Sequence, residues 1–404
     1  MTERRVVITG MGIVSALGWT LEETWFALRD ERSGLRQLSL FRLDDRPALL
    51  VGEVKEDPAA RSGLRLGSRT EHLAVCAARQ AFEHAGLSSL PLEARRSIGV
   101  ALGVCTGGML DSEEYVAQTL CEIDPGLELL RRHECSCATN AIAEALSLGG
   151  PCSTVSVACT SGAAAISVAR DMIASGEADM MLAGGADSLT RLTVCGFLSL
   201  LVVAPDGCKP FDARRAGMCL GEGAGILALE SEAHAQARGA RALARLCGAA
   251  NTCDAHHCTA PAPGGAGIVR AMQTALAEAG LSPEDVDYVN AHGTGTIDND
   301  IAEGKALTEV FSPRFPWISS TKRFFGHTLA AAGAIEAIVA ILALRRQYVP
   351  ANLGLEVADP SLPFTPCLHT TPAALRVVMS NSLGFGGSNA SLVFSRVAGE
   401  EKAS

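Results

Sequence analysis

The chain has 404 residues, of which 48% are hydrophobic and 19% charged, so it is globular and long enough for two core-forming units. A net charge of −10 and an aromatic content of only 4% argue against nucleic acid or an anionic membrane as the main partner. An acidic protein partner would have to dock on a local basic patch. No apolar stretch of about 18 residues is free of charge, so we expect no membrane span. The 14 cysteines lack the spacing of a disulfide scaffold, and no secretion signal is visible, which predicts a cytoplasmic protein.

The first part of the chain alternates strand and helix patterns. Thr20 precedes a helical pattern whose first turn carries Glu22 and Glu23, as expected of an N-cap. The segment 110–137 shows no clear pattern. We expect strands at 5–10, 97–102, 153–158, 180–183 and 226–230, and helices at 20–29, 69–85, 163–174 and 232–238.

A second series follows, with strands expected at 242–250, 286–291, 317–320 and within 377–394, and helices at 267–279, 298–310 and 327–346. Each series contains one helix of extreme alanine and glycine content, and such helices are buried on all sides. Two of them side by side predict an α/β fold of five layers, α-β-α-β-α, with two mixed sheets around a buried helix pair. We place the boundary between the two halves at 1–242 and 243–404.

Cys159 stands where the strand predicted at 153–158 gives way to the helix predicted at 163–174. The helix dipole and the free N–H groups of the first turn would favour a thiolate there. The small residues at 161–165 allow close backbone approach, which both a buried helix and a thioester in a narrow slot require. Position alone still favours the simpler alternative that Cys159 is one more small buried cysteine.

Three glycine-rich turns carry unusual polar residues: Ala-Cys-Thr-Ser-Gly at 158–162, Asn-Ala-His-Gly-Thr-Gly-Thr at 290–296, and Ser-Thr-Lys-Arg-Phe-Phe-Gly-His at 320–327. Cys159 and His327 each open an alanine-rich helical pattern, and His292 follows a predicted strand. A lone histidine in a glycine turn is usually solvated or structural. One cysteine with two histidines at the ends of separate core elements indicates thiol chemistry assisted by two imidazole donors.

In this order the motifs resemble the β-ketoacyl-acyl-carrier-protein synthases of the thiolase superfamily, and among them the FabF-like elongating type. The match extends over nearly the whole chain, and its further motifs are Lys-Pro-Phe-Asp at 209–212, Gly-Glu-Gly-Ala-Gly at 221–225 and Gly-Phe-Gly-Gly-Ser-Asn at 384–389. The resemblance implies a thiolase-like fold and a decarboxylative Claisen condensation. A cysteine-bound acyl chain would be extended by two carbons from a malonyl-carrier protein.

The resemblance also implies catalytic roles. Cys159 would accept the acyl group, and the backbone amides of Cys159 and Phe385 would form the oxyanion hole. The neutral imidazoles of His292 and His327 would donate to the enolate oxygen of the malonyl unit. Lys322 would organise the site.

Further residues are implied to bind or support the substrate. Asp300 and Glu303 would lie beneath His292 and Lys322; read alone, they are acidic residues of a helix N-terminus. The resemblance assigns the phosphopantetheine arm and its entrance to Thr294, Thr296, Asp254 and Thr259.

Two positions bear on the acyl pocket. Phe197 belongs to the apolar stretch 195–204, which borders the pocket or is plain core. Thr106 aligns with the position that gates the floor of the acyl tunnel, and a threonine there leaves more room than isoleucine.

We expect neither a metal nor a bound cofactor, because the phosphopantetheine arm arrives on the carrier protein. Cys-Asp-Ala-His-His-Cys at 253–258 looks like a metal cluster, but four ligands in six residues are too crowded to close one tetrahedral site. The turn 221–225 looks like a phosphate loop but lacks the following lysine and hydroxyl residue.

Two alternatives remain. A degradative thiolase would carry a second catalytic cysteine near the C-terminus, where the turn 384–387 has none. A non-catalytic chain-length-factor-like subunit would have lost the nucleophile, whereas Cys159 is present. The expected partners are an acyl carrier protein and either an identical subunit or a ketosynthase-like chain-length factor. The segments 186–193 and 292–300 resemble those of dissociated polyketide and aryl-polyene pathways, so a fatty-acid and a polyketide pathway both stay open.

Overall fold

The computed structural model describes residues 4–43 and 48–397. Its centre is a ten-stranded sheet. One half consists, in spatial order, of β5 (Cys152–Val155), β4 (Gly99–Gly103), β6 (Met180–Asp187), β7 (Gly223–Ser231) and β1 (Val6–Val14). The other half continues with β8 (Ala244–Cys253), β14 (Ser388–Ser395), β13 (Val377–Gly384), β9 (Tyr288–Asn290) and β10 (Trp317–Ser319). The halves join where β1 pairs with β8 over only three residue pairs, Val6–Leu246 to Ile8–Ala244.

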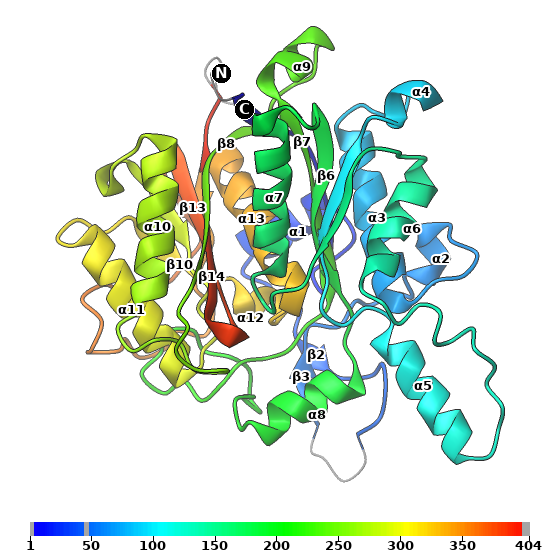
Figure 1. Cartoon of the computed structure of the whole chain (residues 1–404). Coiled ribbons are helices and arrows are strands. Elements are labelled where there is room, and N and C mark those ends of the chain that lie inside the picture. The colour runs from blue at the N-terminus through cyan, green and yellow to red at the C-terminus, as the bar shows by residue number, and fades with distance from the viewer. Residues whose placement is uncertain (1–3, 44–47, 398–404) are drawn as a thin grey trace.

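Helices fill the space between the two halves and cover both outer faces, as Figure 1 shows. The inner layer holds α7 (Ser161–Ser175) and α13 (Ala332–Arg346), which pack against each other and against both halves. Outside lie α3 (Arg69–His84) and α6 (Ser136–Leu146) on one side, and α10 (Ala266–Ala279) and α11 (Ile297–Phe311) on the other. The five predicted layers are confirmed, with one refinement: the two predicted sheets are hydrogen-bonded to each other along β1 and β8.

The inner helices approach their neighbours backbone to backbone, which explains their alanine and glycine content. Every residue of α13 from Ala332 to Leu344 is buried. A Cβ added to Gly162 of α7 would lie 2.6 Å from the Ala330 carbonyl oxygen, and one added to Gly185 of β6 would lie 2.4 Å from the same atom. Side chains larger than hydrogen do not fit at these two positions.

Shorter elements complete the chain. α1 (Leu21–Arg29) has the predicted N-cap at Thr20, closed by a capping box with Glu23. The unassigned segment 110–137 contains most of α5 (Met109–Leu120). The other helices and strands are α2 (Ala59–Ser62), α4 (Leu92–Arg95), α8 (Arg191–Ser199), α9 (Glu232–Ala237), α12 (Lys322–Phe325), β2 (Arg36–Gln37), β3 (Leu50–Val51), β11 (Tyr348–Val349) and β12 (Thr371–Pro372). Within 4–43 and 48–397, no helix combines the length and the apolar character that crossing a membrane requires.

Two sequence predictions about the inner region were wrong. The strand before Cys159 is not buried. Within the described residues, β5 is the end strand of the sheet and pairs with β4 alone, and its residues are partly exposed. The helix predicted from His327 begins later, because a 3-10 turn (Leu329–Ala331) separates the histidine from α13. His327 therefore lies in a loop before the helix.

The close contact at Gly185 predicts a stability loss on substitution. Gly185→Ala should destabilise the fold by about 1–3 kcal/mol, because the added methyl group overlaps the Ala330 carbonyl. Gly196→Ala on α8 is the control, because a Cβ there meets no atom within 4 Å. It should be neutral or stabilising by up to about 1 kcal/mol. Denaturant unfolding of both variants measures the difference, and equal stabilities would contradict the prediction.

Candidate active site

Cys159 lies in a tight turn between β5 and α7 that hydroxyl groups hold in place. The Ser161 hydroxyl accepts the Val157 N–H at 2.9 Å and donates to the Ala158 carbonyl at 2.6 Å. Ala158 has a φ of 52°, a left-handed conformation that is strained for alanine. The turn therefore fixes the direction of the Cys159 side chain before any substrate binds.

A cavity of about 400 Å³ opens onto Cys159. It brings together residues from both halves of the chain, most of those that the sequence pointed to. They are Cys159, Phe197, Asp254, Thr259, His292, Thr294, Thr296, His327 and Phe385.

The Cys159 thiol is not acidified by its position. Burial raises its pKa to about 11, although the charge of Lys322 and the backbone groups of Phe385 and Cys159 act in the opposite direction. The sequence predicted a thiolate from the helix N-terminus, and this was wrong, because the loss of hydration outweighs those favourable interactions. The resting thiol keeps its proton.

The two histidines lie side by side at the cavity as neutral rings in edge-to-face contact. Their ring centroids lie 5.2 Å apart with an interplanar angle of 85°, and both side chains are buried. Burial, followed by the positive charge of Lys322, lowers the pKa of both imidazoles well below the usual value. Neutral imidazoles can donate hydrogen bonds without carrying charge into the cavity.

Lys322 sets the tautomer of His292. Its ammonium lies 3.2 Å from Nδ1 of His292 and donates to the His292 carbonyl at 2.9 Å. Because Nδ1 accepts from the ammonium, the ring proton of His292 sits on Nε2. Lys322 also forms a buried ion pair with Glu336 of α13.

Glu336 is a site residue that the sequence reasoning missed. Burial raises the pKa of its carboxyl to about 7, against the lowering effect of Lys322. The sequence did contain a signal for it: Glu336 is the single charged residue in the otherwise apolar segment 329–344. A charged side chain is buried in a helix only where an oppositely charged or hydrogen-bonding group pairs with it.

Glu303 and Asp300 of α11 fix the turn at 292–296. Glu303 accepts the N–H groups of His292 and Gly293, each at 2.8 Å, and burial raises its pKa to about 8. Asp300 accepts the N–H of Gly295 at 3.2 Å and that of Phe211 at 2.7 Å. Both carboxylates thus lie under the His292 turn as predicted, but the carboxylate bonded to Lys322 is Glu336.

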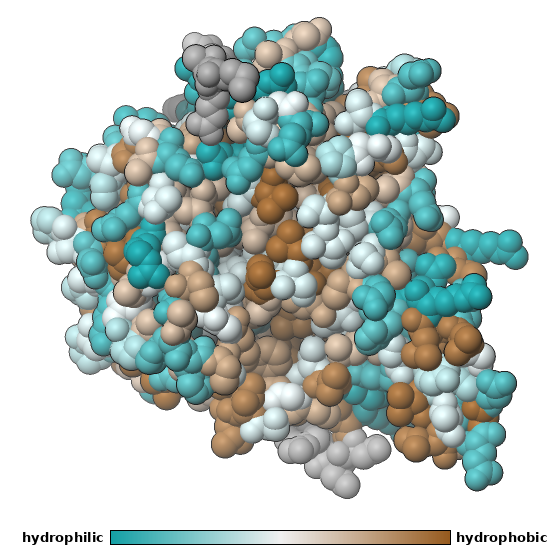
Figure 2. All heavy atoms as spheres, in the orientation of Figure 1, coloured by the Kyte–Doolittle hydropathy of each residue, from teal (hydrophilic) through white to brown (hydrophobic). Residues whose placement is uncertain are grey.

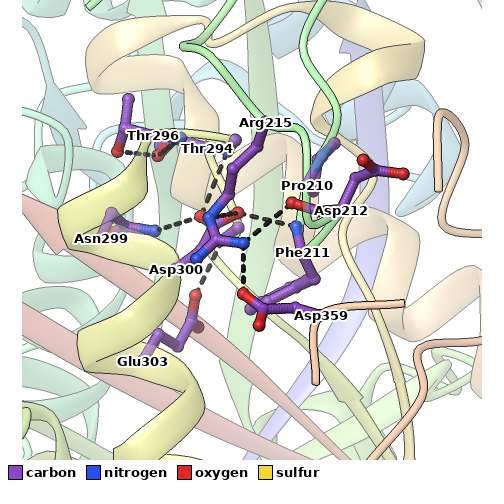
Figure 3. Close-up of polar contacts among 12 residues, drawn as sticks. Pro210, Phe211, Asp212, Arg215, Thr294, Thr296, Asn299, Asp300, Glu303 and Asp359 are labelled. Carbon is purple, nitrogen blue, oxygen red and sulfur yellow. Dashed lines mark hydrogen bonds and ion pairs between the residues drawn. The ribbon is translucent and has the colours of Figure 1, made fainter. Parts of the chain in front are cut away.

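Figure 3 shows how the segment 210–212 is attached to this turn through the Phe211 N–H, which donates to Asp300. Arg215 extends to Asp300, at 3.9 Å, and to Asp359, at 2.5 Å. Asp300 thus connects the His292 turn to the segment 211–215, which Arg215 in turn links to Asp359.

Five more of the predicted residues line the cavity: Phe197, Thr294, Thr296, Asp254 and Thr259. The ring of Phe197, from α8, stacks on that of Phe385 at 5.5 Å. The hydroxyls of Thr294 and Thr296 lie 2.9 Å apart. Asp254 accepts from Asn389 at 2.8 Å and from the Ala262 N–H at 2.9 Å. The Thr259 N–H donates to the His257 ring. Within the described ranges, no group of three or more His, Cys, Asp or Glu side chains is placed to hold a metal ion, and this includes the segment 253–258.

Thr106 does not line this cavity. Its N–H and its hydroxyl both donate to Asp187 at 2.8 Å, and the Ala330 N–H donates to the same carboxylate at 2.9 Å. Burial raises the pKa of Asp187 to about 6. A role of Thr106 in acyl length stays a prediction.

Two sequence profiles match this chain: "Beta-ketoacyl synthase, N-terminal domain" over residues 3–235 and "Beta-ketoacyl synthase, C-terminal domain" over residues 243–356. The chain belongs to the β-ketoacyl synthase family. Nodulation protein E of Rhizobium meliloti strain 1021 is 40% identical, over 98% of this chain and all of the relative. 3-Oxoacyl-[acyl-carrier-protein] synthase 2 of Synechocystis is 36% identical, over 98% of this chain and 99% of the relative.

A solved structure shows the same fold. "The ishigamide ketosynthase/chain length factor" matches with a TM-score of 0.93 and 34% identity, over 98% of this chain and all of that chain. This member of the ketosynthase family is an acyltransferase of the 3-oxoacyl-acyl-carrier-protein synthase type, which catalyses a condensation in fatty-acid or polyketide biosynthesis.

The raised pKa of Cys159 predicts how its alkylation depends on pH. Between pH 7 and 9.5, alkylation of Cys159 by iodoacetamide should accelerate about tenfold per pH unit, because only the thiolate reacts and its fraction rises up to the pKa. Peptide mass mapping at each pH measures the rate at this cysteine separately from the other thiols. A rate that is already constant near pH 8 would contradict the prediction.

Proposed function

We propose that Cys159 carries the acyl chain and that His292 and His327 stabilise the enolate of the malonyl unit in the same cavity. One observation supports these roles above all: a single cavity of about 400 Å³ is lined by the buried thiol and by both imidazoles. The low pKa of each imidazole supports a role as neutral hydrogen-bond donor.

The first half-reaction transfers the acyl group to Cys159. Its sulfur attacks the thioester carbonyl of the acyl-carrier protein, and the backbone N–H groups of Cys159 and Phe385 stabilise the oxyanion. The backbone of Phe385 already lies against the thiol. The thiol proton ends on the departing pantetheine sulfur, so the products are an acyl-cysteine and a free carrier-protein thiol. Because the resting thiol is protonated, its proton must pass to the departing pantetheine sulfur as the thioester bond breaks.

The second half-reaction consumes the malonyl unit. The bond between the malonyl carbons breaks, carbon dioxide leaves, and the enolate oxygen accepts hydrogen bonds from His292 and His327. The enolate carbon then attacks the acyl-cysteine carbonyl, and the Cys159 sulfur leaves and is reprotonated. The product is a 3-ketoacyl chain on the carrier protein, longer by two carbons.

The proposal extends to the partners. An acyl carrier protein delivers both substrates on its phosphopantetheine arm, which Thr294 and Thr296 at the cavity wall would hold, with Asp254 and Thr259 at its entrance. The acyl-carrier-protein synthase name of the Synechocystis relative supports this partner. A ketosynthase-like subunit, identical or a chain-length factor, is the second partner. The similarity to the ishigamide ketosynthase/chain length factor supports the chain-length factor.

Two assays of histidine variants test the assigned roles. His292→Ala and His327→Ala should lose malonyl decarboxylation by about 10² to 10³, the usual effect of removing one such donor. Acylation of Cys159 by an acyl-carrier protein, followed by intact mass, should fall far less.

The cysteine variant supplies the control. Cys159→Ala should show no acyl adduct and no condensation. An adduct on another cysteine with Cys159 unmodified would refute the nucleophile, and normal decarboxylation in both histidine variants would refute the enolate role.

Thr106 provides a test of acyl length. Thr106→Phe should slow acylation by long acyl chains by roughly one to two decades and leave short chains nearly unchanged, since overpacking typically costs about 1–3 kcal/mol. Thr106→Val is the matched control, because it removes the hydroxyl donated to Asp187 at almost constant volume. If both variants lose activity equally at all lengths, Thr106 acts through Asp187 and the acyl tunnel lies elsewhere.

A further inference from the structure

Charged side chains normally lie at the surface, and hydrophilic groups cover much of the face that Figure 2 shows. Asp187, the last residue of β6, is one of the exceptions, because its side chain is completely buried. It does not line the cavity at Cys159, and the four hydrogen bonds that it accepts come from uncharged groups. Burying a carboxylate is expensive, so these four bonds must offset a large loss of hydration.

The two oxygens of Asp187 hold different segments of the chain. Oδ1 accepts the N–H groups of Cys105 at 3.0 Å and Thr106 at 2.8 Å, and also the Thr106 hydroxyl at 2.8 Å. Oδ2 accepts the Ala330 N–H at 2.9 Å. The three donors on Oδ1 fix the orientation of the carboxylate, so Oδ2 is aimed at the 3-10 turn that follows His327.

The turn after His327 contains a strained residue. Leu329 has a φ of 52°, a left-handed conformation that is unfavourable for leucine and persists only where the surrounding structure holds it. The next N–H along the chain, that of Ala330, is the one that donates to Asp187. β6 contacts the same residue a second time, because the backbone of Gly185 lies against the Ala330 carbonyl. Asp187 and Gly185 therefore fix the chain three residues after His327.

The ring of His327 depends on its backbone more than the ring of His292 does. Lys322 bonds to the ring of His292, whereas Nδ1 of the buried His327 ring has no hydrogen-bond partner among the described residues. The backbone is held on both sides of His327: its own N–H donates to the Cys219 carbonyl at 2.6 Å, and the turn that follows is bonded to Asp187. Loosening that turn should therefore move the imidazole.

We propose that Asp187 is a positioning residue for His327: through the Ala330 N–H, it holds the imidazole where it can donate to the enolate oxygen of the malonyl unit. The inference rests on the proposed function, because it takes that role of His327 from it. Asp187 does not line the cavity, so its effect on the reaction passes through the turn at 329–331.

Asp187→Asn breaks one side of this contact at constant volume. The amide keeps one acceptor oxygen, which the three donors of Cys105 and Thr106 engage, and turns its NH2 group toward the Ala330 N–H. The kcat of malonyl decarboxylation should fall about ten- to hundredfold, because a misplacement of about 1 Å can cost about 10² in rate. The KM for malonyl-carrier protein and the rate of Cys159 acylation should change less than about threefold, because neither depends on the bond to Ala330.

A double variant shows whether the effect passes through His327. In a His327→Ala background, Asp187→Asn should lower decarboxylation by less than about twofold more, because residues that act through one group are not additive. Equal fold losses in both backgrounds, or equal losses of decarboxylation and acylation, would make Asp187 a purely structural residue and overturn the proposal. Normal decarboxylation by Asp187→Asn, with a loss in His327→Ala, would overturn this inference alone. Normal decarboxylation by His327→Ala would refute the proposed function, and the inference with it.

Asp287→Asn is the matched control. Its carboxylate also accepts two backbone N–H groups, those of Arg376 at 2.6 Å and Val377 at 3.0 Å, but it does not line the cavity, so both half-reactions should be unchanged. If Asp187→Asn fails to fold, the same bond can be removed from the other side. An ester in place of the amide between Leu329 and Ala330 deletes the N–H and leaves the carboxylate. The same selective loss of decarboxylation is expected, and equal losses of both half-reactions, or none, would overturn the proposal.

Discussion

A buried ammonium group connects the parts of this active site. Lys322 contacts His292 through both the ring and the carbonyl, and it pairs with Glu336 of the inner helix α13. Removing two charges from water is expensive unless hydrogen bonds satisfy them, so the pair is stable only when the His292 turn, α12 and α13 are all in place. The same charge adds to burial in lowering the pKa of His292 and His327, whereas at Cys159 it opposes burial, which raises the pKa.

These electrostatic effects distinguish the site from a thiolate–imidazolium pair. Both imidazoles have lowered pKa values and the Cys159 thiol has a raised one, so at neutral pH the proton stays on sulfur and neither ring is charged. Two neutral donors suit an enolate oxygen, whose charge appears only after carbon dioxide has left. In the proposed mechanism, the Cys159 thiol loses its proton only as the pantetheine sulfur leaves and accepts it.

The sequence predicted the members of the site better than their physical state. Cys159, His292 and His327 belong to short motifs that can be recognised from consecutive residues in the sequence. The structure places all three on one cavity. The acidity of Cys159 could not be predicted, because it depends on burial by segments far away in the chain. The exposed edge of β5 and the Thr106–Asp187 contact were missed for the same reason: both depend on which strand or carboxylate lies alongside.

The placement of Cys159 relative to His327 follows from backbone contact rather than from side-chain packing. Gly162 stands three residues after Cys159, Ala330 stands three residues after His327, and a Cβ on Gly162 would lie 2.6 Å from the Ala330 carbonyl oxygen. Side chains can change rotamer, but two backbones in contact leave no such freedom. The two halves of the chain thus meet at the point where the alanine-rich helices begin. The small residues that first indicated a buried helix pair therefore also position Cys159 and His327.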